Sequence, residues 1–181
     1  MRPSRFFPLV VLIAGGLLSA SCGYTLAGRG SFLPDTIKTI GVPDFANNTT
    51  FYQVEQVLTQ KVRSEFIGRG KYKVLPQETG VDAVLKGEIA SITITPSVFN
   101  ESQQATRYVI TVTAKIEFRD LHADKVLWQN PGLVFREDYD VASRGTTVTD
   151  PATFFGQEAN ALERVGSDFA RTVVSAILES F

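Results

Sequence analysis

The sequence predicts a two-layer α+β sandwich, in which a mixed and mostly antiparallel sheet carries two amphipathic helices on one face. Three observations lead to this prediction. Long segments with apolar residues at every second position indicate strands that bury one face. Two segments with apolar residues at helical spacing indicate helices with one apolar stripe each. Finally, helices and a half-apolar sheet bury both apolar surfaces when they pack together.

The first predicted strand covers residues 36–45, a short apolar run that ends at a turn marked by Asn47 and Asn48. A second strand covers residues 71–75. The segment between them is long enough for a helix, and a strand, helix, strand order of this length favours a right-handed crossover. The two strands are therefore expected to be parallel.

The helix between these strands is predicted to begin near Thr50. Thr50 and Gln53 have the spacing of a capping box, and Gly68 and Gly70 are typical of a helix end. Its apolar stripe consists of Val54, Val57, Leu58, Val62 and Phe66.

Three long strands follow, at residues 83–95, 106–118 and 126–141, and a polar turn at 121–124 makes this part a meander. The middle strand alternates most regularly. One of its faces consists of Tyr108, Ile110, Val112, Ala114, Ile116 and Phe118. Its other face consists of Arg107, Thr111, Thr113, Lys115, Glu117 and Arg119, with Val109 as the exception. We therefore expect one buried face and one polar face.

Two interruptions in these strands predict β-bulges. The apolar phase slips between Ile89 and Ile92, and Pro131-Gly132 breaks the last strand. An extra residue in one strand explains both patterns without ending the strand.

A closing helix is predicted to start at Asp150, a natural N-cap, with Pro151 in the first helical position. Its apolar stripe consists of Phe155, Leu162, Val165, Phe169, Val173, Ala176 and Ile177. The two helices are expected to cover the same face of the sheet.

The N-terminus has the order of a bacterial lipoprotein signal peptide. Arg2 and Arg5 precede an uncharged apolar run that ends in small residues at Cys22, the only cysteine. The run is shorter than the roughly 20 residues that a membrane-spanning helix needs. Cys22 sits as in a lipobox, although Ser19 stands where leucine is usual. We expect cleavage before Cys22 and attachment of acyl chains such as palmitate; the alternative is a secreted protein with a free thiol at Cys22.

Three segments are expected on this basis: a removed signal peptide (1–21), a lipidated N-terminus and tether (22–36), and a single α+β domain (37–181). Acyl chains would hold the protein at a membrane surface. Gly23 stands where an aspartate would resemble an inner-membrane retention signal. The expected location is the outer membrane, facing the periplasm.

Composition argues against several functions. The whole chain has a net charge of −1, and without Arg2 and Arg5 it becomes −3, so a nucleic-acid binder is not expected. The glycines at 28–33 and 68–71 lack the spacing of a phosphate-binding loop, and no cofactor is expected. His122, the only histidine, lies in a predicted turn and is interpreted as a solvated residue.

One acidic cluster keeps an enzyme as a minor alternative. Glu137, Asp138 and Asp140 carry carboxylates that could do acid-base chemistry. In a strand, however, Asp138 and Asp140 share a face while Glu137 points away, which favours a solvated strand end. The neighbouring Trp128 and Tyr139 are interpreted as core residues rather than as partner contacts. The chain is not expected to be an enzyme.

Arg107, Lys115 and Arg119 are the candidate binding residues because they share the polar face of the most regular strand. They either solubilise an exposed sheet or form a ladder that meets phosphates or other acidic groups.

Several segments carry a resemblance to a known family. They are CGYTLAGRGSFLPDTIKTIGVPDFANNT, DAVLKGEI, ATRYVITVTAKIEFRD, VLWQNP and ARTVVSAILESF. In order and spacing the chain resembles the LptE family of lipopolysaccharide-assembly lipoproteins over nearly all of residues 22–181. The resemblance implies a non-enzymatic outer-membrane lipoprotein that plugs the β-barrel LptD and helps deliver lipopolysaccharide. It also implies a sheet packed against two helices.

A second resemblance implies a different function. Periplasmic scaffold or activator lipoproteins of the LpoB and CsgG type use a similar strand and turn. The matching residues are Ile40, Val42, Phe45, Asn47 or Asn48, and Thr49 or Thr50. Such a protein would bind an envelope enzyme or form a secretion assembly.

Overall fold

Three long antiparallel strands form the middle of the fold. The computed structural model describes residues 33–69, 71–141, 154–157 and 159–180. The long strands are β4 (Ala83–Phe99), β5 (Ala105–Asp120) and β6 (Lys125–Asp140). Each is antiparallel to the next, and a turn at 121–124 joins the last two, so the predicted meander is confirmed. Strand β4 extends four residues beyond its predicted end at Thr95, whereas both ends of β6 lie within one residue of the predicted bounds.

The alternation predicted for β5 is confirmed. Its six apolar residues from Tyr108 to Phe118 are all at most 3% exposed. On the opposite side Arg107 and Lys115 are exposed and Arg119 is half-buried. We call this opposite side, which carries Arg107, Lys115 and Arg119, the outer face of the sheet.

Both predicted bulges are confirmed by shifts in strand register. In the β4–β5 pair the register shifts between Ile89 and Ser91. In the β5–β6 pair it shifts where Pro131 and Gly132 stand between the paired residues Asn130 and Leu133. The bulges let long strands keep their apolar residues on one side while the sheet twists.

Three short strands complete the sheet: β1 (Thr39–Gly41), β2 (Ala46–Asn47) and β3 (Lys73–Leu75). The sheet order is β3-β1-β4-β5-β6, and β2 also pairs with β4. The predicted parallel arrangement of the first strand and the strand after the helix is confirmed by the β1–β3 pairing.

The strand predicted over 36–45 is too long, because β1 ends at Gly41 and the next strand, β2, begins only at Ala46. Pro43 has no N–H to donate to a ladder. Phe45 then turns inward, and its ring lies where a side chain at Gly87 would be, 2.7 Å from an ideal Cβ at that position. The backbone N–H of Phe45 donates to Thr59 Oγ1 at 3.0 Å, so the chain leaves the sheet between the two strands.

Helix α2 (Val54–Gly68) starts later than predicted, and the capping box is wrong. Gln53 has a left-handed φ of 63°, and no side chain caps the helix. Asn47 organises the turn instead: its Nδ2 donates to Phe51 O at 2.8 Å and to Glu55 Oε2 at 2.7 Å. The predicted stripe is buried except for the half-buried Val57.

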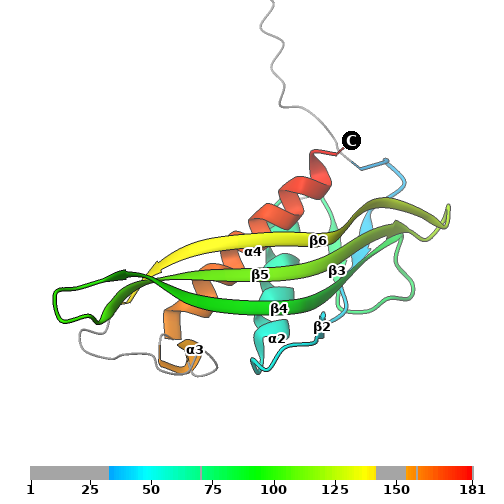
Figure 1. Ribbon diagram of the computed structural model, residues 1–181. Helices are drawn as coiled ribbons and strands as arrows, with labels where there is room; N and C mark the ends of the chain where they lie inside the picture. The colour runs from blue at the N-terminus through cyan, green and yellow to red at the C-terminus, as the bar shows by residue number, and fades with distance from the viewer. Residues whose placement is uncertain (1–32, 70, 142–153, 158, 181) are drawn as a thin grey trace, which may run out of the picture. The chain divides into compact units, whose positions relative to one another are not determined.

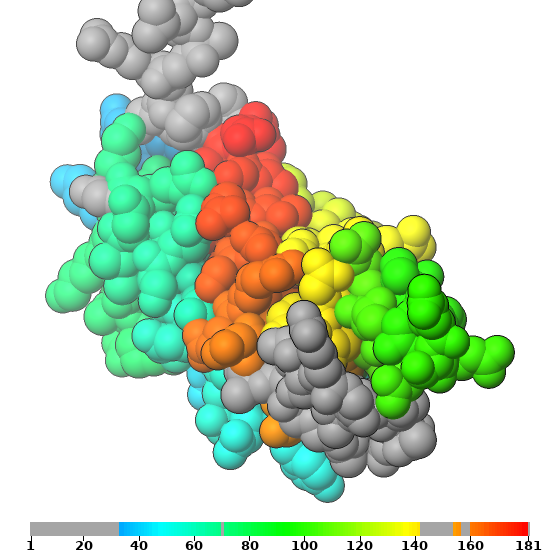
Figure 2. All heavy atoms as spheres, turned by 90° about the vertical axis from the view of Figure 1, so that its left-hand side faces the viewer, coloured from blue at the N-terminus to red at the C-terminus, as the bar shows by residue number. Residues whose placement is uncertain are grey.

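The closing helical region comprises α3 (Phe154–Gln157) and α4 (Ala159–Leu178). The predicted start at Asp150 and Pro151 lies outside the described residues. Figure 2 shows α4 lying between α2 and β6. At Gly166 an ideal Cβ would be 3.3 Å from Val57 Cγ1, so a small residue here lets the two helices approach closely.

Both helices pack on the apolar face of the sheet, and the predicted two-layer α+β sandwich is confirmed (Figure 1). Phe66 of α2 stacks on Phe118 of β5 with ring centroids 6.4 Å apart. Phe169 of α4 meets Phe135 of β6 edge to face at 6.0 Å. Leu33, which lies before the predicted domain start at residue 37, is also in this core.

Candidate functional site

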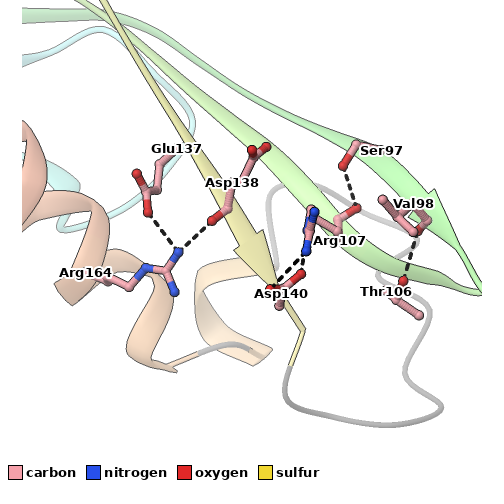
Figure 3. A network of polar contacts seen from close by, with 8 residues as sticks. All are labelled: Ser97, Val98, Thr106, Arg107, Glu137, Asp138, Asp140 and Arg164. Carbon is pink, nitrogen blue, oxygen red and sulfur yellow. Dashed lines mark hydrogen bonds and ion pairs between the residues drawn. The ribbon is translucent and has the colours of Figure 1, made fainter.

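The outer face places Arg107 at one end of β5, beside the hairpin that links β4 and β5. Its Nε lies 2.6 Å from Asp140 Oδ1 on the neighbouring strand β6 (Figure 3). This hydrogen bond raises the pKa of Arg107 and lowers the pKa of Asp140. Both side chains are therefore charged around neutral pH, and they neutralise each other.

Lys115 lies in the middle of β5, opposite the bulge at Pro131. Its Nζ is 2.8 Å from Glu88 Oε1 on β4, which also accepts a hydrogen bond from Asn48 Nδ2 at 2.9 Å. A shallow hollow of about 390 Å³ opens here. Its lining consists of Ala46, Lys86, Gly87, Glu88, Lys115, Ile116, Glu117, Gln129 and Pro131.

Arg119 lies near the other end of β5. Its Nε is 3.0 Å from Glu117 Oε1, and its Nη1 is 3.1 Å from Asp124 Oδ1. Hydrogen bonds to these two carboxylates raise the pKa of Arg119. The guanidinium therefore has two anionic partners within its own sheet.

The structure thus brings the three candidate residues to one face but does not bring them together. At roughly 3.3 Å per strand residue, Lys115 lies about 26 Å from Arg107, and Arg119 lies about 40 Å from it. Each also has an acidic partner. A single small anion cannot meet all three, whereas an extended polyanionic ligand or a polar wall can.

Two cations on the outer face, Lys86 and Arg136, were not predicted from the sequence, and Arg136 differs from the others. It lies opposite Thr111 in the β5–β6 register and is exposed. Unlike the three predicted residues, it forms no ion pair within the described parts of the chain. The alternation of Leu133, Phe135 and Tyr139 after the predicted bulge would have placed it on this face.

The acidic cluster at the end of β6 serves the fold. Arg164 of α4 donates to Glu137 Oε1 at 2.8 Å and to Asp138 O at 2.6 Å, as Figure 3 shows. Its guanidinium also lies 5.3 Å from the centre of the Tyr139 ring. Two of the three carboxylates thus have arginine partners on opposite sides of β6. Tyr139 is buried in the core, as predicted. Trp128 is partly buried and packs against the same core.

His122 is exposed, as predicted for a turn residue, but it is not simply solvated. Its Nε2 lies 2.8 Å from Asp82 Oδ1. The other oxygen of Asp82 accepts hydrogen bonds from the backbone N–H groups of Lys38 and Thr39 and from Thr39 Oγ1. These contacts, led by the bond with His122, hold the pKa of Asp82 well below its usual range. Asp82 thereby fastens β1 to the turn between β5 and β6.

The described residues offer few groups for chemistry. Within them no three histidine, cysteine or carboxylate side chains gather as a metal site would require. No helix of this part of the chain is long and apolar enough to cross a membrane. Cys22 lies outside the described residues.

The fold and the outer face define the general class of this protein. It is an α+β protein in which helices cover one face of the sheet and the other face is a broad polar surface. The family comparison is more specific. The model of the LptE family, described as lipopolysaccharide-assembly, matches residues 37–177. The chain belongs to this family, and the family assigns it to lipopolysaccharide assembly.

Solved structures with a TM-score of 0.50 or more show the same fold at low sequence identity. The PelC dodecamer from Paraburkholderia phytofirmans has a TM-score of 0.52 and 16% identity, covering 82% of this chain and 92% of PelC. Protein CT253 from Chlamydia trachomatis has a TM-score of 0.50 and 9% identity, covering 79% and 99%. Rare lipoprotein B from Shewanella oneidensis has a TM-score of 0.45 and 12% identity, covering 78% and 98%. A search of curated proteins finds no significant match.

The pairing of His122 with Asp82 predicts a pH-dependent stability. The hydrogen bond to Asp82 raises the pKa of His122. The resulting stabilisation is therefore complete below the ordinary histidine pKa of about 6.5 and declines as the pH rises through the raised value. We expect His122→Ala to lower the urea midpoint more at about pH 5.5, where Asp82 is ionised, than at about pH 9.

His122→Gln is the matched control, because glutamine can donate to Asp82 but does not titrate. Its effect on the midpoint should be the same at both pH values. An equal loss for His122→Ala at both pH values would show that the ion pair contributes nothing beyond a neutral hydrogen bond.

Proposed function

We propose that this protein is an outer-membrane lipoprotein that is cut before Cys22, lipidated there, and seated in the β-barrel LptD during lipopolysaccharide assembly. The match to the LptE family over residues 37–177 is the observation that carries the proposal. The signal-like N-terminus that ends at Cys22 supports lipid anchoring and a periplasm-facing position. The protein would act by binding, without catalysis and without a cofactor.

The outer face supports a role as a plug. Its central rows consist mainly of hydroxyl and small side chains: Ser91, Thr93, Thr95, Val109, Thr111, Thr113 and Val134. Ion pairs within the sheet neutralise the cations at both ends. The lumen of an outer-membrane barrel is polar. A polar and largely neutral sheet face can lie against such a wall while burying little unpaired charge, since Arg136 is its one cation without an ion pair among the described residues.

The hairpin between β4 and β5 lengthens the outer face. It extends past the helices, at the end of the sheet farthest from β1 (Figure 1). Val98 and Phe99 near its tip are 43% and 57% exposed. Exposed apolar side chains at a projecting tip suit contact with a partner, and we propose that this hairpin enters the barrel first.

Contact with lipopolysaccharide is proposed for the cations of the outer face. Arg136 can meet a phosphate directly, because no carboxylate of the described chain occupies it. Arg107, Lys115 and Arg119 can do so by exchanging their present partners for phosphate oxygens. The ligand would thus run along β5 and β6 rather than enter a closed pocket.

Purification of the lipidated protein from membranes in mild detergent tests the proposed partnership. We expect a barrel-sized outer-membrane protein to be recovered with it. The Cys22→Ala variant should still recover this partner, because the contact surface lies in the folded part. Recovery of a periplasmic enzyme domain in place of a barrel would support the scaffold function and contradict ours.

Binding to lipopolysaccharide micelles tests the proposed contact residues. Reversing Arg107, Lys115 and Arg119 together to glutamate should weaken binding at least about tenfold, because charge-assisted hydrogen bonds to phosphate are lost and repulsion is added. Arg136→Glu should weaken it more than Arg171→Glu, a control on the exposed side of α4. Unchanged binding in both outer-face variants would overturn the assignment.

A further inference from the structure

Most cations of the described chain are held in ion pairs, but five are not. They are Lys38, Lys71, Lys73, Lys125 and Arg136. Three of these five belong to one small region around β1 and β3. A lysine without an ion pair keeps its full attraction for an anionic ligand. This cluster is therefore a candidate binding surface.

We call Lys38, Lys71 and Lys73 the lysine edge. Lys73 lies in β3, the edge strand of the sheet, and its backbone N–H donates to Lys38 O at 2.9 Å. Lys38 and Lys71 line one small hollow together with Leu33. All three lysines are exposed. They therefore form a continuous basic surface where the described chain begins.

The nearby carboxylates do not cancel this surface. Asp35 lines the same hollow, and Glu179 lines the next one, which also includes Lys71. Neither carboxylate forms an ion pair with a lysine of the edge. Arg69, also beside this second hollow, is already paired with Glu65 at 2.9 Å. Asp82 and Asp120 line a further hollow beside Lys38, but Asp82 is bound by His122 and by the backbone of β1, and Asp120 is buried. The three exposed lysines therefore outnumber the two exposed carboxylates without ion pairs, Asp35 and Glu179.

The length of the chain before Leu33 places this surface near the proposed lipid. Leu33 follows Cys22 by eleven residues. Eleven residues span at most about 40 Å even when fully extended. The hairpin tip lies farther off, since β4 alone covers about 50 Å from Val84 to Phe99 at about 3.3 Å per residue. The lysine edge is thus the end of the sheet that the lipid keeps closest to the membrane.

We infer that the lysine edge docks on the anionic phospholipid headgroups of the leaflet that receives the Cys22 lipid. This inference rests on the proposed lipidation. A short tether makes the contact effectively intramolecular, so a weak electrostatic attraction is sufficient. The anchor and the lysines together then hold the folded chain at the leaflet in which its barrel partner lies.

Vesicle binding tests the docking surface without the lipid. The chain from Cys22 onward, carrying Cys22→Ser, is sedimented with phosphatidylcholine vesicles that contain either no phosphatidylglycerol or roughly 30% of it. One variant combines Lys38→Gln, Lys71→Gln and Lys73→Gln. The matched control combines Lys61→Gln, Lys86→Gln and Arg171→Gln, which removes three charges from exposed or half-buried sites elsewhere.

We expect binding that requires phosphatidylglycerol, falls about tenfold or more in the lysine-edge variant, and stays within about twofold in the control. Salt at about 0.5 M should abolish it, because screening shortens the range of the attraction. Equal binding of the two variants, or absence of binding to anionic vesicles, would overturn the inference. A failure of the proposed function would be seen in a different experiment, as an unmodified Cys22 or as the absence of a barrel partner after purification from membranes. The vesicle assay depends on neither result, because the chain used in it carries no lipid and is tested without a partner.

Discussion

The structure depends on one constraint: the sheet is covered by helices on one side only. Strand β5 shows its effect most clearly, because all six apolar residues from Tyr108 to Phe118 face the helices and are almost fully buried. Moving this strand by one residue would turn its whole apolar set to solvent. The two bulges, the close helix approach at Gly166 and the aromatic contacts of Phe66 and Phe169 all preserve this one-sided burial.

The same constraint creates the surface that we assign to binding. A sheet face without helices must be polar, yet isolated charges would make it costly to bury against a partner. The outer face resolves this by pairing Arg107 with Asp140, Lys115 with Glu88, and Arg119 with Glu117 and Asp124. Arg136 is the exception on this face. A partner can therefore cover most of the surface while one cation is available for an anionic group.

The periodicity of the sequence predicted the structural features that depend on local residue patterns. The alternation in β5, both bulges, the parallel β1–β3 pair and the stripe of α2 followed from spacing alone. What it missed depends on contacts between distant segments. The ring of Phe45 divides the first strand because it fills the space above Gly87, and Asn47 replaces the expected cap at Thr50. The acidic partners of Arg107 and Lys115, and the lysine edge, emerge only when separate strands are placed side by side.

We propose that the outer face is the surface that meets a barrel partner. Site-specific photocrosslinking in cells tests it most directly, with the crosslinking residue placed at Thr111 on the outer face or at Gln60 on the exposed side of α2. We expect a crosslinker at Thr111 to capture an outer-membrane β-barrel protein. Capture of such a barrel only from Gln60, or of a periplasmic enzyme domain from Thr111, would contradict it.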